Sequence, residues 1–203
     1  MSGQPARGVH RPGARELARR AIKAQVSEMA LDLFLANGYE QTTIDDICDA
    51  AGISRSTFFR YFPSKEDLFA GTTASAAGEL LEALRERPEG EAAWTALRHA
   101  LGPLVAHYAS PPERAARLAR LARTTPALAA LNRDKLTGMQ TLLAPEIARR
   151  LGADPNDTAD PRANALIAAA LGCLEAAVTA WAAGDGAPPL SELLLRAMNS
   201  IGG

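Results

Sequence analysis

Apolar residues recur at intervals of three and four along almost the whole chain, and glycine or proline interrupts the pattern between successive apolar stretches. This spacing places apolar side chains on one face of an α-helix, whereas a half-buried strand would alternate apolar and polar positions. The pattern therefore predicts an all-α protein. About nine helices are expected, over residues 14–37, 44–51, 55–61, 64–87, 91–107, 113–123, 126–151, 161–183 and 190–201. Pro103 and Pro145 fall inside two of these helices and should kink or split them.

Capping signals divide the N-terminal part into two short helices joined by a tight turn. Thr43 stands three residues before Asp46, which is a capping-box pattern, and Asp45 is also expected to act as a capping group. Gly52 gives the turn its backbone freedom, and Ser54 can cap the second helix. Two short helices around a three-residue turn have the geometry in which the second helix enters the major groove of DNA.

The polar side chains around this turn carry groups suited to nucleic acid. Arginine can donate two hydrogen bonds to guanine, threonine can offer its methyl group to thymine, and hydroxyl or ammonium groups suit phosphate oxygens. Phe58 and Phe62, four residues apart, can face the core at the same time. The polar positions of the second helix are Arg55, Ser56, Thr57 and Arg60, and those suited to phosphate are Thr43, Ser54, Tyr61 and Lys65.

Charge is distributed unevenly, although the formal net charge is only -1. The first 23 residues hold six Lys or Arg residues and a single Glu. Such an excess of positive charge indicates a polyanionic partner. Residues 1–13 are expected to form a flexible basic arm that follows the minor groove or the DNA backbone, and a solvated tail without contacts is the alternative.

Several classes of function find no support in the sequence. No apolar run comes near the roughly 20 residues needed to span a membrane, and residues 1–13 hold no secretory signal. Cys48 and Cys173 have no partners at metal-ligand spacing, and no catalytic triad, carboxylate pair or phosphate loop can be assembled. We expect a cytoplasmic protein without a membrane partner, metal, cofactor or catalytic residues, and not an enzyme.

Residues 42–68, TTIDDICDAAGISRSTFFRYFPSKEDL, resemble the DNA-binding domain of the TetR family of bacterial repressors, and the resemblance covers about residues 14–69. It implies a homodimer whose two recognition helices enter successive major grooves of a palindromic operator in double-stranded DNA. It also implies that Thr43, Arg55, Thr57, Phe59, Tyr61 and Lys65 occupy DNA-facing positions. Phe59 stands where the family often has Tyr, so a hydroxyl contact is missing there.

Residues 70–203 are expected to form a ligand-binding and dimerisation domain. Two apolar helices near the C-terminus would pair with their counterparts in a four-helix interface, which is the arrangement in the TetR family. The expected interface residues are Leu171, Leu174, Val178, Trp181, Leu194 and Met198. The alternative for each of them is a place in the core of a single chain.

The remaining C-terminal helices should enclose a pocket for a small molecule. Its expected lining is Leu101, Leu104, Tyr108, Leu118, Leu121, Leu128, Met139, Leu142 and Glu175, which is mostly aliphatic and suits a lipid-like ligand. Residues 120–128 and 160–181 are similar to the mycofactocin-type subgroup of TetR regulators, which implies an acyl-CoA-like ligand. Arg114, Arg117, Arg120 and Arg123 could bind phosphates at the pocket mouth, but a three-residue step spirals around a helix and favours a solvated face.

The sequence thus predicts a DNA-binding transcriptional repressor that a small effector releases from its operator. One alternative is a helical protein-interaction module without specific DNA binding. Another is a DNA-binding regulator that responds to no small molecule.

Overall fold

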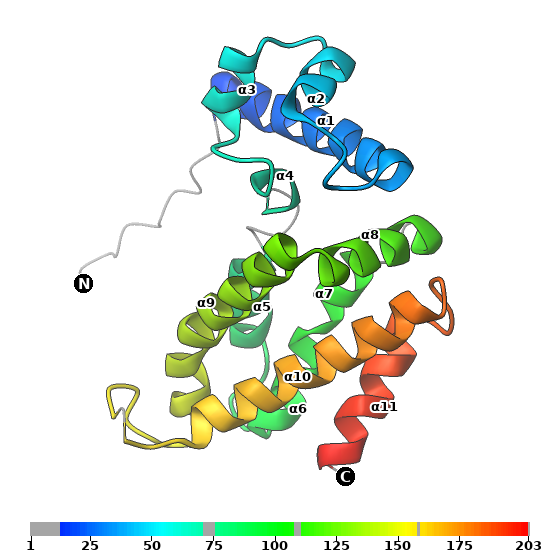
Figure 1. Cartoon of the computed structure of the whole chain (residues 1–203). Helices are drawn as coiled ribbons and strands as arrows, with labels where there is room; N and C mark the ends of the chain where they lie inside the picture. The colour runs from blue at the N-terminus through cyan, green and yellow to red at the C-terminus, as the bar shows by residue number, and fades with distance from the viewer. Residues whose placement is uncertain (1–12, 71–75, 108–110, 158, 203) are drawn as a thin grey trace, which may run out of the picture.

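The computed structural model describes residues 13–70, 76–107, 111–157 and 159–202, and within these ranges it contains eleven α-helices and no strand. The predicted all-α class is confirmed. The N-terminal unit, at the top of Figure 1, holds α1 (Ala14–Asn37), α2 (Ile44–Ala51), α3 (Arg55–Tyr61) and α4 (Asp67–Ala70). The larger C-terminal unit holds α5 (Ala76–Arg85), α6 (Ala93–Ala100), α7 (Gly102–His107), α8 (Pro112–Thr124), α9 (Pro126–Arg150), α10 (Arg162–Ala183) and α11 (Leu190–Gly202).

The helix boundaries follow the predicted ones except in two regions. Helices α4 and α5 lie where one helix over 64–87 was expected, and residues 71–75 between them are outside the described ranges. The helix expected over 91–107 is divided at Leu101, just before Pro103, which has no N–H with which to continue the hydrogen-bond ladder. Pro145, in contrast, is accommodated inside α9.

Two clusters of buried hydrophobic side chains form separate cores. The N-terminal core contains Phe34 of α1, Ile47 of α2 and Phe58 of α3, all almost completely buried. The C-terminal core is larger and draws on every helix from α5 to α11. Leu128 of α9 is the exception, because it is buried in the N-terminal core although it lies in the C-terminal part of the chain. The α8–α9 corner is therefore inserted between the two units.

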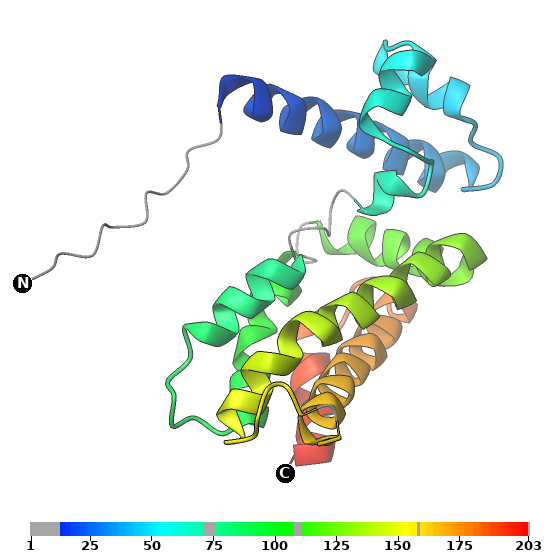
Figure 2. The same cartoon turned by 90° about the vertical axis from the view of Figure 1, so that its left-hand side faces the viewer.

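Ion pairs and backbone contacts reinforce this junction along α8, which lies beneath α1 in Figure 1. The Arg114 guanidinium contacts the carboxylates of Glu28 at 2.9 Å and Asp32 at 2.8 Å. Arg117 donates a hydrogen bond to the Leu35 carbonyl at 3.2 Å. Figure 2 shows the same junction from the side, with the N-terminal unit resting above α8 and the start of α9. Helix α8 is thus attached to the unit that contains the predicted helix-turn-helix.

Helix α10 is the central helix of the C-terminal unit and packs against α6, α8, α9 and α11. Its length and composition would allow it to cross a membrane, so the statement that no apolar run approaches that length is wrong for residues 162–183. Its apolar character is spread over many alanines, which are individually only weakly apolar. Ile167, Leu171 and Trp181 are buried within the chain, which is the environment of a core helix.

Candidate nucleic-acid interface and effector cavity

The turn between α2 and α3 is fixed by the capping groups that the sequence predicted. The Thr43 amide donates to Asp46 Oδ2 at 2.8 Å, and the Asp46 amide donates to Thr43 Oγ1 at 3.1 Å, so the capping box is confirmed. Gly52 has φ 63°, a left-handed conformation that favours glycine. The Ser54 hydroxyl then accepts a hydrogen bond from the Thr57 amide at 3.1 Å, which begins α3.

Helix α3 divides sharply into a buried and an outward-facing side. Phe58 and the following Phe62 are completely buried in the N-terminal core. Because these two rings anchor the helix, its other side must face solvent. The exposed or partly exposed residues are Ser54, Arg55, Ser56, Thr57, Phe59, Arg60 and Tyr61. Phe59 is 46% exposed, so part of its ring is accessible from the outward side of α3.

Arg55 at the start of α3 is held by Asp45 of α2. Its Nη1 atom lies 2.9 Å from both carboxylate oxygens of Asp45, while both side chains remain largely exposed. Asp45 was expected to be a capping group, and the structure shows it as an ion-pair partner because Asp46 already occupies the capping position. Nη2 and Nε of Arg55 have no recorded partner within the described ranges. This edge of the guanidinium is available for a base.

Lys65 and Thr43, like the capping residue Ser54, already have hydrogen-bond partners within the chain. The Lys65 ammonium donates to the carbonyls of Tyr39 at 2.7 Å and Thr42 at 3.1 Å. The Tyr39 hydroxyl donates to Glu66 at 2.6 Å, and this hydrogen bond holds the pKa of the Glu66 carboxyl below its usual range. The Thr43 hydroxyl donates to Asp46. Lys65 thus ties the loop before α2 to the chain after α3.

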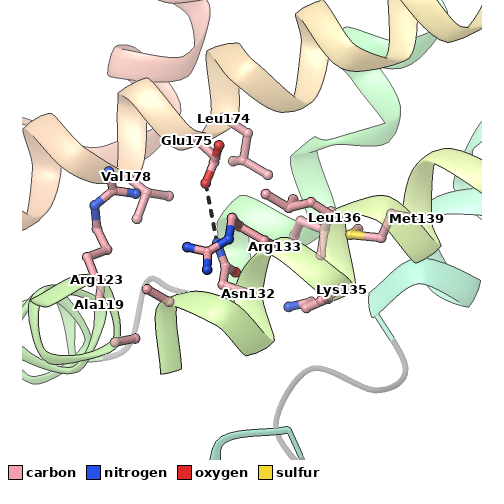
Figure 3. A pocket seen from close by; sticks show the side chains of 13 residues that line it. Ala119, Arg123, Asn132, Arg133, Lys135, Leu136, Met139, Leu174, Glu175 and Val178 are labelled. Atoms are coloured by element: carbon pink, nitrogen blue, oxygen red, sulfur yellow. Dashed lines mark hydrogen bonds between the residues drawn. The ribbon is translucent and has the colours of Figure 1, made fainter. Parts of the chain in front are cut away.

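A cavity of about 340 Å³ lies in the C-terminal unit between α7, α8, α9 and α10 (Figure 3). Its volume is near the lower end of the roughly 300–1,000 Å³ that small-molecule sites usually have. Its lining comprises Leu104, Ala119, Ala122, Arg123, Ala129, Asn132, Arg133, Lys135, Leu136, Met139, Leu174, Glu175 and Val178. The cavity is partly apolar, with several charged groups.

Only part of the expected pocket lining reaches this cavity. Leu104, Met139 and Glu175 line it, together with Leu174 and Val178, which were assigned to the dimer interface. Tyr108 lies outside the described residues. The rest lie elsewhere: Leu101 in the C-terminal core, Leu118, Leu121 and Leu128 against or within the N-terminal core, and Leu142 on the surface. The helical period identified apolar faces but not the element that covers each one.

Basic residues of the cavity were missed by the sequence analysis, apart from Arg123 in the arginine series of α8. That series does spiral: Arg114 and Arg117 contact α1, and Arg120 contacts Asp185 and the end of α10. Arg123 lines the cavity with Arg133 and Lys135 of α9. Polar residues at positions 132, 133 and 135 interrupt the apolar pattern of α9, and this interruption could have pointed to Arg133 and Lys135.

Two electrostatic features mark the cavity. The Asn132 side-chain amide donates to Glu175 at 3.3 Å, which links α9 to α10 (Figure 3). Burial lowers the pKa of the Lys135 ammonium to about 8, because little water remains to solvate its charge. A buried cation without an opposite charge destabilises a fold, and such groups are more frequent at functional sites than elsewhere.

The expected dimer residues lie mostly inside a single chain. Leu171, Trp181, Leu194 and Met198 are buried among the chain's own helices, so they offer almost no surface to a partner. This placement agrees with the alternative of an intramolecular core. The outward face of α10 instead consists of small residues, which are Ala165, Ala168, Gly172, Ala176 and Thr179. Beside it, α11 exposes Leu195 and Ile201.

Replacement of Lys135 by methionine should stabilise the protein at neutral pH. Below pH 8 the folded chain must hold a poorly solvated charge, and this penalty disappears as the pH rises from about 8 toward the unfolded pKa of 10.5. The gain in the free energy of unfolding for Lys135→Met should therefore be largest at pH 7 and shrink above pH 8. Urea denaturation at pH 7 and near pH 10.5 measures the free energy of unfolding of each protein. Lys23→Met on α1 is the control. Equal gains at both pH values would contradict the burial of the charge.

Comparison with known proteins gives matches over both units. Residues 28–72 match the profile described as bacterial regulatory proteins, tetR family, and residues 91–203 match the MftR C-terminal domain. The HTH-type transcriptional regulator TcmR of Streptomyces glaucescens is 39% identical over 158 residues, 74% of this chain and 70% of that protein. MftR of Mycobacterium tuberculosis, whose name proposes a role in regulating mycofactocin biosynthesis, is 31% identical over 139 residues, 68% of this chain and 70% of that protein.

Solved structures share the fold at lower identity. FadR of Thermus thermophilus, a repressor in complex with lauroyl-CoA, is 24% identical with a TM-score of 0.56 and covers 87% of this chain and 91% of its own. FadR of Bacillus subtilis, a regulator in complex with stearoyl-CoA, is 21% identical with a TM-score of 0.59 and covers 86% and 95%. At these identities the structures establish the arrangement of helices alone.

Proposed function

The chain belongs to the TetR family of bacterial regulatory proteins and is a transcriptional regulator, and from this premise we propose that it is a homodimeric, cytoplasmic repressor. Residues 14–69 bind a palindromic operator, and residues 70–203 bind an effector and a second copy of the chain. The relatives named above are transcriptional regulators, which are not enzymes, and we propose no catalytic activity for this chain either.

The outward side of α3 is the observation that carries this proposal. The anchored rings of Phe58 and Phe62 force Arg55, Ser56 and Phe59 outward, at the start of a helix whose length suits the major groove. Asp45 orients the Arg55 guanidinium, so that Nη2 and Nε can reach the two acceptors of a guanine. Phe59 can then pack on a sugar or a thymine methyl group.

Selection of bound sequences from random duplex DNA tests operator recognition. We expect two inverted half-sites with centres about 34 Å apart, one for each protomer. Arg55→Ala should relax the preference at one base of each half-site, at a cost of about 1–3 kcal/mol. Asp45→Asn should raise affinity for all DNA and lower discrimination, because it removes a negative charge and the support of Arg55.

Arg85→Gln, on α5 outside the proposed interface, is the control and should leave the motif unchanged. If no motif emerges and weak binding only falls with salt, the protein-interaction alternative becomes the better one. A palindromic motif without any stabilising small molecule would favour the regulator that lacks an effector.

The exposed small-residue face of α10 and the neighbouring surface of α11 form the proposed dimer interface. Small side chains let two helices approach closely, and exposed Leu195 and Ile201 supply apolar area beside them. This assignment replaces the buried residues that periodicity selected, and it keeps the two C-terminal helices that the resemblance implied. A two-fold dimer uses the same patch of both chains, which a single surface of this kind allows.

Ala168→Glu should therefore give a monomer without unfolding the chain. The residue is exposed in one protomer, so a carboxylate is tolerated there, but it would be buried without a counter-charge between two copies. Light scattering measures the mass, and far-UV circular dichroism checks the fold. Thr141→Glu, on the exposed side of α9, is the control and should remain dimeric. A dimeric Ala168→Glu protein would place the interface elsewhere.

The α8–α9 corner couples effector to operator in this proposal. Ala122 lines the cavity and also packs against the N-terminal core, so one methyl group separates the two. Leu128, in the first turn of α9, is buried in that core. An effector that moves α8 shifts the surface on which the DNA-binding unit packs. This shift changes the spacing of the two recognition helices.

Leu128→Ala should weaken the mechanical link between the units. The cavity left in the N-terminal core should cost about 2–5 kcal/mol of unfolding free energy. Trp94 and Trp181 both belong to the C-terminal unit, so tryptophan fluorescence reports that unit, whereas circular dichroism reports all helices. The urea transitions followed by fluorescence and by circular dichroism should coincide in the wild type and separate in the variant.

Leu143 lies on the same helix but is buried in the C-terminal core, and Leu143→Ala provides the comparison. It should lower stability by a similar amount and leave the two transitions coincident, because it does not touch the junction. Coincident transitions in Leu128→Ala would show that other contacts hold the units together.

A further inference from the structure

The charges around the cavity mouth identify the chemistry of the effector. We propose that it is a small organic acid with an apolar body, whose acidic group is bound by Arg123, Arg133 and Lys135. This inference rests on the proposed function, since it assigns a ligand to the effector cavity. It also changes the sequence-based expectation, which described the pocket as mostly aliphatic and suited to a lipid-like ligand.

The first argument is the balance of charge. Three basic side chains and one carboxylate, Glu175, line the cavity, which leaves an excess of two positive charges when Lys135 is protonated. Within the described ranges, none of the three basic side chains has a recorded ion-pair partner. Arg114 and Arg120, on the same helix as Arg123, are both paired with carboxylates. Arg117 of α8 donates to a backbone carbonyl, so within the described ranges Arg123 is the one arginine of this series for which the structure gives no hydrogen-bond or ion-pair partner.

The second argument is their arrangement. Arg123 and Arg133 are exposed at the opening, and Leu104, Leu136 and Met139 form an apolar wall. Figure 3 shows Arg123 beside Val178 on one side of the cavity and Leu136 with Met139 on the other. A ligand with one acidic end and one apolar end matches both regions at once. Charge-assisted hydrogen bonds from arginine to a carboxylate are among the strongest available for such recognition.

The other classes of ligand fit less well. A neutral lipid-like molecule would fill the apolar part and leave the excess of two positive charges uncompensated. A cationic ligand would face these cations, and the single carboxylate that could attract it already accepts a hydrogen bond from Asn132. A thioester of coenzyme A supplies negative charge through its phosphates instead of a carboxylate, and the experiment must separate these two sources.

Calorimetric titration of the full-length protein, without DNA, compares four probes with the same ten-carbon chain. These are decanoate, decan-1-ol, decyltrimethylammonium and decanoyl-CoA. We expect decanoate to bind about tenfold more tightly than decan-1-ol, as one charge-assisted pair would give. Arg123→Gln and Arg133→Gln should each reduce decanoate affinity about tenfold and leave that of decan-1-ol unchanged. Arg85→Gln, outside the cavity, is the matched control and should change neither.

Glu175→Gln supplies a test of opposite sign. It removes the one negative charge of the lining and keeps an acceptor for Asn132, so decanoate should bind more tightly. Equal affinity for decanoate and decan-1-ol, unchanged affinity in both arginine variants, or no binding of any probe overturns the proposal. If decanoyl-CoA binds and decanoate does not, the effector is not a free acid, and the basic residues are assigned to the phosphates of coenzyme A. Acid binding in a protein that selects no DNA motif would instead count against the proposed function alone.

Discussion

The burial of Leu128 in the N-terminal core is the contact on which the rest of the molecule depends. Pro126 begins α9 directly after α8 ends, and this corner inserts the leucine among the aromatic rings of the helix-turn-helix unit. The N-terminal core is the smaller of the two and includes one fully buried side chain from the other unit. The outward surface of α3 therefore belongs to a unit that packs on the same element that lines the cavity.

Helix α8 lines the cavity and also packs against the N-terminal core, and this double contact decides how an effector could act. A close-packed core does not deform gradually, so a change in α8 is transmitted to α1 or resisted as a whole. The ion pairs of Arg114 with Glu28 and Asp32 extend the contact along the helix, although exposed pairs of this kind add little stability each. Occupation of the cavity shifts the equilibrium only if the ligand binds the released arrangement more tightly than the DNA-bound one.

Local sequence signals predicted much of this architecture. The capping box of Thr43 and Asp46, the left-handed Gly52 and the cap at Ser54 all lie within a few residues of the helices they define. The inward placement of Phe58 and Phe62 follows from their spacing on one helix. Such features need no knowledge of distant elements, and for that reason the helix-turn-helix could be read from the chain alone.

The cavity could not be read in the same way, because its lining depends on which faces of separate helices meet. Periodicity selected Leu121 and Leu128 for the cavity and Trp181 for the dimer interface, and the fold places Leu121 and Leu128 at the N-terminal core and Trp181 in the C-terminal core. The charged lining escaped notice for the opposite reason: Arg133, which stays exposed, and Lys135 look like ordinary solvent-facing residues, and only the packing of α8 and α10 beside α9 makes them part of a cavity lining. A poorly solvated lysine lowers stability whenever it carries charge, and together with Arg123 and Arg133 in the same lining this cost supports the proposed acidic effector.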